Sequence, residues 1–270
     1  MHFHINHISI KGCLYSDHLE RTVDFRLFAP PTFWNNPEKF PVLLMNDGQD
    51  FEKMELEKTL SHAFASEQIK SFIYVGISAG NRLQEYGTAG CADFKGRGAR
   101  AEKYSRFILK ELIPFLKKEF NASHEKADWV FCGMSLGGLN AFDIGFNNPD
   151  YFDKIGVFSG SFWWRKKPYI KGDMVDRSRI VLDMVKNAEH DSHLKFWFQC
   201  GSQDERADRN DNGIIDSIDD TLDLVKELQT KGYSFPGDIT YVQVEGGKHD
   251  LPTWAKVFPE FLRWAFGEGD

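Results

Sequence analysis

Short apolar runs alternate with longer stretches of helical periodicity along the whole chain. Runs of four to six mostly apolar residues predict buried strands, and the alternating segment 23–28 predicts a strand with one exposed face. Between these runs, apolar residues recur every three to four positions, which predicts helices. The predicted strands cover residues 23–28, 41–45, 72–77, 129–132, 155–158, 196–200 and 239–244, and the predicted helices cover residues 101–120, 136–147, 218–231 and 253–266.

This alternation of strands and helices predicts an α/β fold, a mostly parallel sheet with helices on both faces. No internal repeat or low-complexity linker divides the chain, so residues 1–270 are expected to form a single domain. The active sites of such sheets lie at the carboxyl ends of the strands. The residues that follow each predicted strand are therefore the candidates for chemistry.

Composition and charge narrow the class of protein. Hydrophobic residues make up 41% and charged residues 27%, which excludes wholesale disorder. No apolar run approaches the ~20 residues of a membrane helix, so no membrane partner is expected. A net charge of −7 argues against nucleic acid as a partner. The four cysteines form no disulfide or zinc pattern and the first residues do not form a signal peptide, which together predict a cytoplasmic protein.

A candidate nucleophile follows the predicted strand 129–132. Residues 133–137 read Gly-Met-Ser-Leu-Gly, which is the G-x-S-x-G sequence between a strand and a helix. In this tight turn, a side chain at Gly133 or Gly137 would collide with neighbouring backbone, and the serine hydroxyl is pushed out over the sheet edge. Ser135 is therefore the predicted nucleophile, and the alternative is a glycine-rich turn with an incidental serine.

A serine hydroxyl is a weak nucleophile and needs a base to accept its proton. His249 follows the last predicted strand in a glycine-containing loop, which makes it the predicted base. Asp204 follows the preceding strand and is predicted to orient and charge-balance the imidazole. The competing residues are His190 and His193 for the base, and Glu205 and Asp208 for the acid.

The oxyanion formed during acyl transfer needs two fixed donors. The backbone N–H of Leu136, immediately after the nucleophile, is predicted to be one of them. The loop at residues 46–50 follows another predicted strand, and its Gly48 lets the chain turn inward. The backbone N–H of Gln49 is therefore the predicted second donor.

Several segments together resemble a known family. They are PVLLMNDGQ from residue 41, the segment 81–86, GMSLGGLNAF from residue 133, the turn 149–152, and GGKHD from residue 246 with Trp254. In this combination and order the chain resembles the esterase D and enterochelin-esterase-like branch of the α/β-hydrolases. The resemblance implies a serine carboxylesterase with Ser135, Asp204 and His249 as its triad. Gln49 falls where the mycolyltransferase relatives keep an oxyanion donor.

The same resemblance bears on the substrate. Members of the family cleave siderophore lactones, feruloyl or acetyl groups on sugars, and S-formylglutathione, so it implies a small-molecule ester without choosing which one. It implies no cofactor for catalysis. Arg82 and Glu85 resemble a pair that lies near the site in siderophore esterases, or they form a surface ion pair. Trp163 and Trp164 could line an acyl pocket or pack beneath a lid, and the insertion 160–194 is expected to shape that pocket.

A second motif lies just after the candidate acid. Residues 208–219 fit the calcium loop D-x-[DN]-x-[DN]-G, with Gly213 at the sharp turn, and end in Asp where the loop usually has a bidentate Glu. Loops of dockerin-type calcium modules look similar and also end in Asp. A structural Ca²⁺ that holds the loop carrying Asp204 is predicted, and the alternative is a surface loop with Asx turns. The predicted ligands are Asp208, Asn210, Asn212, the carbonyl of Ile214, Asp216 and Asp219.

The residues therefore predict ester hydrolysis through an acyl-enzyme. Ser135 attacks the ester carbonyl while His249 takes its proton, and water then releases the acid. Two alternatives use the same scaffold. One is acyl transfer to a sugar or thiol by the same triad, and the other is a non-catalytic binding protein on a hydrolase fold.

Overall fold

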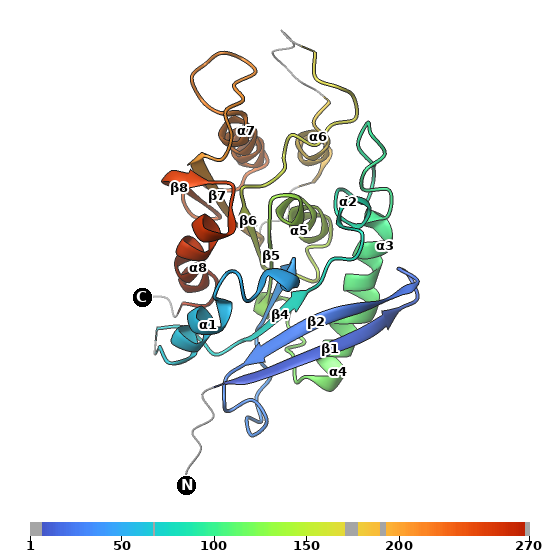
Figure 1. The fold of residues 1–270 in the computed structure, drawn as a ribbon, viewed down its shortest axis with the longest axis vertical. Coiled ribbons are helices and arrows are strands. Elements are labelled where there is room, and N and C mark those ends of the chain that lie inside the picture. The colour runs from blue at the N-terminus through green and yellow to red at the C-terminus, as the bar shows by residue number, and fades with distance from the viewer. Residues whose placement is uncertain (1–6, 67, 171–177, 190–192, 268–270) are drawn as a thin grey trace.

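The computed structural model describes residues 7–66, 68–170, 178–189 and 193–267 (Figure 1). His190 and parts of the predicted insertion 160–194 lie outside these ranges. One eight-stranded sheet runs through the molecule in the order β1-β2-β4-β3-β5-β6-β7-β8. The strands are β1 Ile8–Ser16, β2 Arg21–Ala29, β3 Val42–Asn46, β4 Ile73–Ile77, β5 Trp129–Met134, β6 Lys154–Phe158, β7 Lys195–Gln203 and β8 Ile239–Lys248.

The sheet is mostly parallel, as predicted. Strands β3 to β8 run parallel to one another, whereas β2 runs antiparallel to both β4 and β1 near one edge. Every predicted strand is present, and β1 was missed because its side chains alternate between half-buried and exposed along one edge of the sheet. The fold class is therefore confirmed, with an antiparallel addition.

Helices cover both faces of the sheet (Figure 1). Helices α1 and α8 pack on one face, and the remaining long helices pack on the other. The helices are α1 Leu56–Phe64, α2 Arg82–Glu85, α3 Ala101–Arg106, α4 Ile113–Glu119, α5 Leu136–Asn147, α6 Ile180–Asn187, α7 Asp216–Thr230 and α8 Leu251–Phe266, with short helical turns η1 Gly48–Asp50 and η3 Lys126–Asp128. A π-helical turn, η2 Phe107–Leu112, joins α3 to α4, so the predicted helix 101–120 is one helical stretch with a wider turn inside it.

The central strands are buried on both faces. In β3, Val42 and Leu44 join the core beneath α5, whereas Leu43 and Met45 join the core beneath α1 and α8. This two-sided burial explains why the central strands read as continuous apolar runs. No helix in the described ranges is long and apolar enough to cross a membrane.

The parallel arrangement brings distant residues to one edge of the sheet. Strands β3, β5, β6, β7 and β8 all end at the same edge. Gly48, Ser135, Ser159, Asp204 and His249 each follow one of these strands within two residues. The candidate catalytic residues therefore share the edge at which α/β sheets place their active sites.

Candidate active site

Ser135 lies between β5 and α5 in a backbone conformation that non-glycine residues rarely adopt. Its φ is 54° and its ψ is −121°. Its N–H donates to the carbonyl of Phe158 at 2.8 Å, and its carbonyl accepts from the N–H groups of Gly138 and Leu139. These bonds fix the turn, and the side chain is partly exposed at the start of α5. The serine thus has the strand–turn–helix setting of a nucleophile elbow.

The glycines on either side of Ser135 make this turn possible for two different reasons. A Cβ at Gly133 would lie 2.4 Å from the carbonyl oxygen of Gly137, which is the predicted collision with backbone. A Cβ at Gly137 would instead lie 2.7 Å from Oδ2 of Asp47. The prediction for Gly137 was therefore wrong in its cause, because this glycine makes room for a side chain from the loop after β3.

The loop after β3 approaches the nucleophile closely. A Cβ at Gly48 would lie 2.3 Å from the carbonyl carbon of Gly76 in β4, so only glycine lets this loop rest on the neighbouring strand. The backbone N–H groups of Gln49 and Leu136 make no hydrogen bond within the described residues. Two such unpaired donors at the start of α5 and in the adjacent loop can stabilise an oxyanion.

Asp204 follows a β-bulge at the end of β7. The register with β8 shifts between Gly201 and Gln203. A Cβ at Gly201 would lie 2.4 Å from the carbonyl oxygen of Gly247 and 2.5 Å from Oδ1 of Asp204. Burial raises the pKa of Asp204, while the Ser159 hydroxyl and His249 oppose this rise. The bulge and the glycine together bring the carboxylate to the loop that carries His249.

His249 follows β8 and lies against the first turn of α8. Its ring meets the indole of Trp254 edge-on, with centroids 5.1 Å apart. Partial burial of the ring lowers the pKa of His249, Asp204 opposes this, and Arg82 adds to it. A histidine with a lowered pKa is neutral near pH 7 and can accept a proton.

The three predicted triad residues lie at one edge of the sheet, but no hydrogen bond among the described residues connects them. The Ser135 hydroxyl lies 3.4 Å from the Ser161 hydroxyl. Within the described residues, no hydrogen bond connects His249 to either Ser135 or Asp204. Catalytic hydrogen bonds are often long without substrate and tighten when it binds.

The competing candidates face other parts of the molecule. Asp208 accepts from the backbone N–H groups of its own loop. Glu205 lies near Asp216 and the backbone of Ser217 at the start of α7, and burial raises its pKa. His193 contacts the carbonyl of Phe152, which precedes β6. Of the three carboxylates considered, Asp204 is the one that affects the pKa of His249.

Arg82 and Glu85 do not pair with each other. Arg82 binds the carboxylate of Asp47 through two hydrogen bonds of 2.9 and 3.0 Å, and it also reaches the carbonyl of Met134. Glu85 is buried and paired with Arg21 of β2, at 2.8 and 2.5 Å. Arg82 thus lies beside the nucleophile elbow, whereas Glu85 fastens α2 to the sheet.

The two tryptophans after β6 also differ. Trp164 is fully buried, and its indole packs against Gly87 and Gly98. Trp163 is only partly buried, and the guanidinium of Arg97 lies over both indoles at 5.0 Å. Of the two predicted pocket residues, Trp163 therefore keeps accessible surface for a ligand, and Trp164 belongs to the core.

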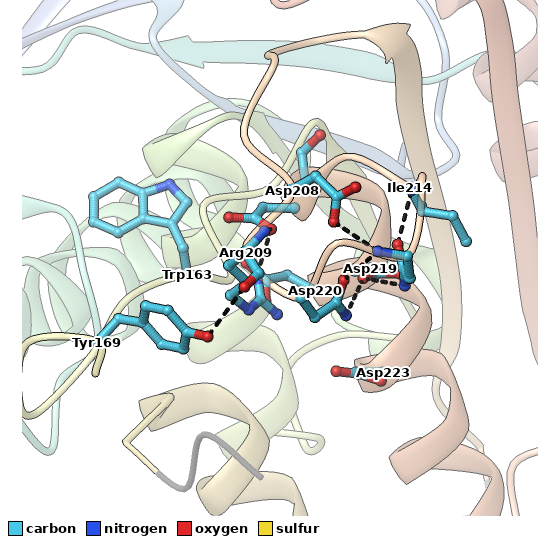
Figure 2. Close-up of polar contacts among 12 residues, drawn as sticks. Trp163, Tyr169, Asp208, Arg209, Ile214, Asp219, Asp220 and Asp223 are labelled. Carbon is cyan, nitrogen blue, oxygen red and sulfur yellow. Dashed lines mark hydrogen bonds and ion pairs between the residues drawn. The ribbon is translucent and has the colours of Figure 1, made fainter. Parts of the chain in front are cut away.

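The loop at 208–219 closes around its own polar side chains (Figure 2). Asp208 accepts from the N–H groups of Asn212 and Gly213 at 3.1 and 2.8 Å. Asp219 accepts from the side-chain amides of Asn210 and Asn212, both at 2.9 Å. Gly213 has a φ of 84°, as the sharp turn requires. Four of the six predicted ligand residues thus converge.

The other predicted ligands are arranged differently. Asp216 begins α7, and its carboxylate pairs with Arg209 at 3.2 Å. The N–H of Ile214 donates to Asn212 at 2.7 Å. Throughout the described ranges, no group of three or more His, Cys, Asp or Glu side chains could hold a metal ion. The carboxylate of Asp216 is therefore paired with an arginine, apart from the contacts that Asp208 and Asp219 make within the loop.

A serine at a nucleophile elbow, on a mostly parallel sheet with helices on both faces, defines the α/β-hydrolase class. The family described as "Putative esterase" matches residues 16–265, so the chain belongs to this esterase family and is a carboxylesterase. Protein YbbA of Bacillus subtilis is 25% identical over 264 residues, which are 96% of this chain and 98% of that protein.

Two solved structures share the fold. A ferulic acid esterase superposes with a TM-score of 0.74 at 20% identity, over 96% of this chain and 97% of that one. The enterobactin esterase FES of Shigella flexneri superposes with a TM-score of 0.75 at 19% identity, over 96% of this chain and 59% of that one. The chain thus spans nearly all of the first solved chain and about three fifths of the second.

Proposed function

We propose that this esterase works through a Ser135–His249–Asp204 triad and an acyl-enzyme intermediate. The observation that carries the proposal is the strained turn at Ser135, beside two unpaired backbone donors. His249 accepts the serine proton as Ser135 attacks the ester carbonyl, and Asp204 holds the imidazole in the correct tautomer. The N–H groups of Leu136 and Gln49 stabilise the oxyanion. His249 then protonates the leaving alcohol, and water releases the acid.

Ser135→Ala tests the nucleophile. We expect hydrolysis of short p-nitrophenyl esters to fall by at least about a thousandfold, because the remaining site supplies only oxyanion stabilisation and binding. A fluorophosphonate probe should label the wild-type protein at Ser135 and leave the variant unlabelled. An active, folded Ser135→Ala variant would overturn the proposal. Product analysis with an added alcohol acceptor distinguishes hydrolysis from acyl transfer.

The substrate proposed for this site is a small ester presented to Trp163 and Arg82. Both side chains keep accessible surface, and Arg82 lies next to the elbow. The folds shared with a ferulic acid esterase and an enterobactin esterase favour feruloyl and siderophore-lactone esters, with acetyl esters of sugars as a third class. A panel containing one ester of each class, ranked by kcat/KM, tests this choice. Equal, low kcat/KM values for all three would exclude them.

We also propose that the loop at 208–219 binds Ca²⁺ as a structural ion. The support is the fit to the calcium-loop sequence, together with the convergence of Asp208, Asn210, Asn212 and Asp219 around Gly213. Binding requires the amide oxygens of Asn210 and Asn212 to turn toward the ion, because oxygen atoms are the ligands that Ca²⁺ takes. Asp216 would act through a water molecule, as the ninth position often does.

Thermal unfolding with and without Ca²⁺ tests this site. At a hundredfold excess over Kd, the ion should stabilise the protein by about 2.7 kcal/mol. Asp219→Asn should abolish the effect, whereas Asp211→Asn should keep it, because Asp211 is not a predicted ligand. Identical unfolding in Ca²⁺ and in chelator would exclude a structural calcium site.

A further inference from the structure

Ser159 occupies a buried and strained position directly after β6. It is 1% exposed and has a φ of 48°, a conformation that is unfavourable for a serine. Its N–H donates to the carbonyl of Gln199 in β7 at 2.7 Å, which fixes the backbone. Such strain persists only where the surroundings hold it in place, and here it sets the direction of the side chain.

The hydroxyl of Ser159 joins the residues around the triad. Nε1 of Trp254 donates to Ser159 Oγ at 2.9 Å, in a fully buried hydrogen bond. A hydroxyl has one proton to donate, and accepting from Trp254 leaves that proton free. The buried carboxylate oxygens of Asp204 have no hydrogen-bond donor within the described residues. Ser159 is close enough to lower the pKa of Asp204.

Trp254 also contacts His249, the proposed base. The edge of its indole meets the ring of His249, with an interplanar angle of 79°. One tryptophan at the start of α8 therefore touches the base directly and reaches the acid through Ser159. A buried carboxylate without a donor is costly, so a hydroxyl next to it is well placed to satisfy it.

We infer that Ser159 and Trp254 are positioning residues, which hold Asp204 and His249 in catalytic register through a Trp254–Ser159–Asp204 hydrogen-bond chain. This inference rests on the proposed triad. The hydrogen-bond chain holds the carboxylate of Asp204, while the Trp254 ring holds the imidazole of His249. Neither residue touches the reacting atoms, and both act through the acid and the base.

The pH dependence of Ser159→Ala activity tests the Trp254–Ser159–Asp204 hydrogen-bond chain. We expect kcat to fall about tenfold, the size of one lost hydrogen bond to a charged group. The acid limb of kcat/KM should move to higher pH, because a carboxylate without its donor stabilises the imidazolium of His249 more strongly. Other titratable groups also face Asp204 or His249, and the substitution leaves them in place: Arg82, Cys200, Glu205, Tyr241 and Asp250.

Trp254→Phe separates the hydrogen bond from the ring contact. Phenylalanine keeps an aromatic ring against His249 and removes the indole N–H. We expect a smaller loss of kcat than for Ser159→Ala, and no further loss when the two substitutions are combined. Additive losses of kcat would show that the two residues act independently, and would overturn the proposed hydrogen-bond chain.

A matched control keeps the result specific. Ser16 is also fully buried, and it donates to the carboxylate of Glu111 at 2.5 Å, far from the site on β1. Ser16→Ala should lower stability without moving the pH profile. If Ser159→Ala fails to fold, Ser159→Gly removes the same hydroxyl and relieves the positive φ.

The outcomes separate this inference from the proposed triad. An unshifted acid limb in the Ser159 variants, or one moved to lower pH, overturns the positioning role while an inactive Ser135→Ala still supports the triad. An active Ser135→Ala overturns both. A shifted limb with an unchanged Ser16→Ala profile supports the hydrogen-bond chain.

Discussion

At the scale of single residues, His249 balances opposing influences. Burial against Trp254 and the nearby guanidinium of Arg82 lower its pKa, whereas Asp204 and Asp250 raise it. The net effect is a pKa below the ordinary 6.5. A base must be unprotonated to accept the serine proton, so this balance sets the pH range in which the enzyme works.

The pH dependence of kcat/KM should therefore have an acid limb with its midpoint below pH 6.5. Activity is present above the pKa of His249 and is lost as the pH falls through it, because the imidazole then takes up a proton. The kcat/KM profile reports the free enzyme, which is the state that the structure represents. A midpoint above 6.5 on a non-ionising ester would contradict the lowered pKa.

The sequence was informative for those residues whose role follows from their position after a strand. The sequence places Ser135, Asp204 and His249 at one edge of the sheet because each follows a predicted strand, and the structure has all three directly after β5, β7 and β8. Ser159 follows a strand in the same way, but its role depends on contacts with Trp254 and Asp204. Contacts between segments that are distant in the chain leave no local pattern, so the supporting residue was missed.

At the scale of secondary-structure elements, the end of β7 decides where the acid lies. The bulge after Gly201 lets β8 and the Asp204 turn approach each other. The sequence predicted the strand but not the bulge, because a glycine after an apolar run also fits an ordinary strand end. Likewise, Arg82 and Glu85 are close in sequence, yet Arg82 pairs with Asp47 in the loop after β3 and Glu85 pairs with Arg21 of β2.

Gly201→Ala should lower kcat/KM by roughly 100-fold, which is the cost of displacing a catalytic group by about 1 Å. The added methyl would lie 2.4 Å from the carbonyl oxygen of Gly247, and backbone cannot turn aside as a side chain can. Gly90→Ala is the matched control, because its Cβ would meet nothing within 4 Å. Equal kcat/KM for the two variants would show that the bulge does not position Asp204.

At the scale of the whole molecule, the central sheet and its long helices could be predicted from the sequence, whereas the edge strand β1 and the short helices could not. The central strands and helices α5, α7 and α8 follow from apolar periodicity, because a core on each face of the sheet demands it. Strand β1 was missed because it is half-exposed, and helices α1, α2 and α6 were missed because they span only nine, four and eight residues. The two-sided core also buries carboxylates that the proposed chemistry does not use, and one of them accepts hydrogen bonds from uncharged donors.

That carboxylate, Asp143 in α5, makes the stability of the whole molecule depend on pH. It accepts from the backbone N–H of Ala89 at 2.8 Å and from the amide of Asn147 at 3.1 Å, and neither donor is charged. Burial raises its pKa from 3.8 to about 7. Between these values the folded state binds a proton that the unfolded state has released, so stability falls as the pH rises through this window.

Asp143→Asn should remove most of this dependence. We expect the variant to be roughly 2 kcal/mol more stable than the wild type at about pH 8, because it no longer buries a charge there, and to differ little near pH 4. Urea unfolding at both pH values measures the difference. Asp150→Asn, an exposed carboxylate just beyond α5, is the control and should follow the wild type. A variant less stable than the wild type at pH 8 would mean that Asp143 stays ionised and stabilises the loop at Ala89 through its charge.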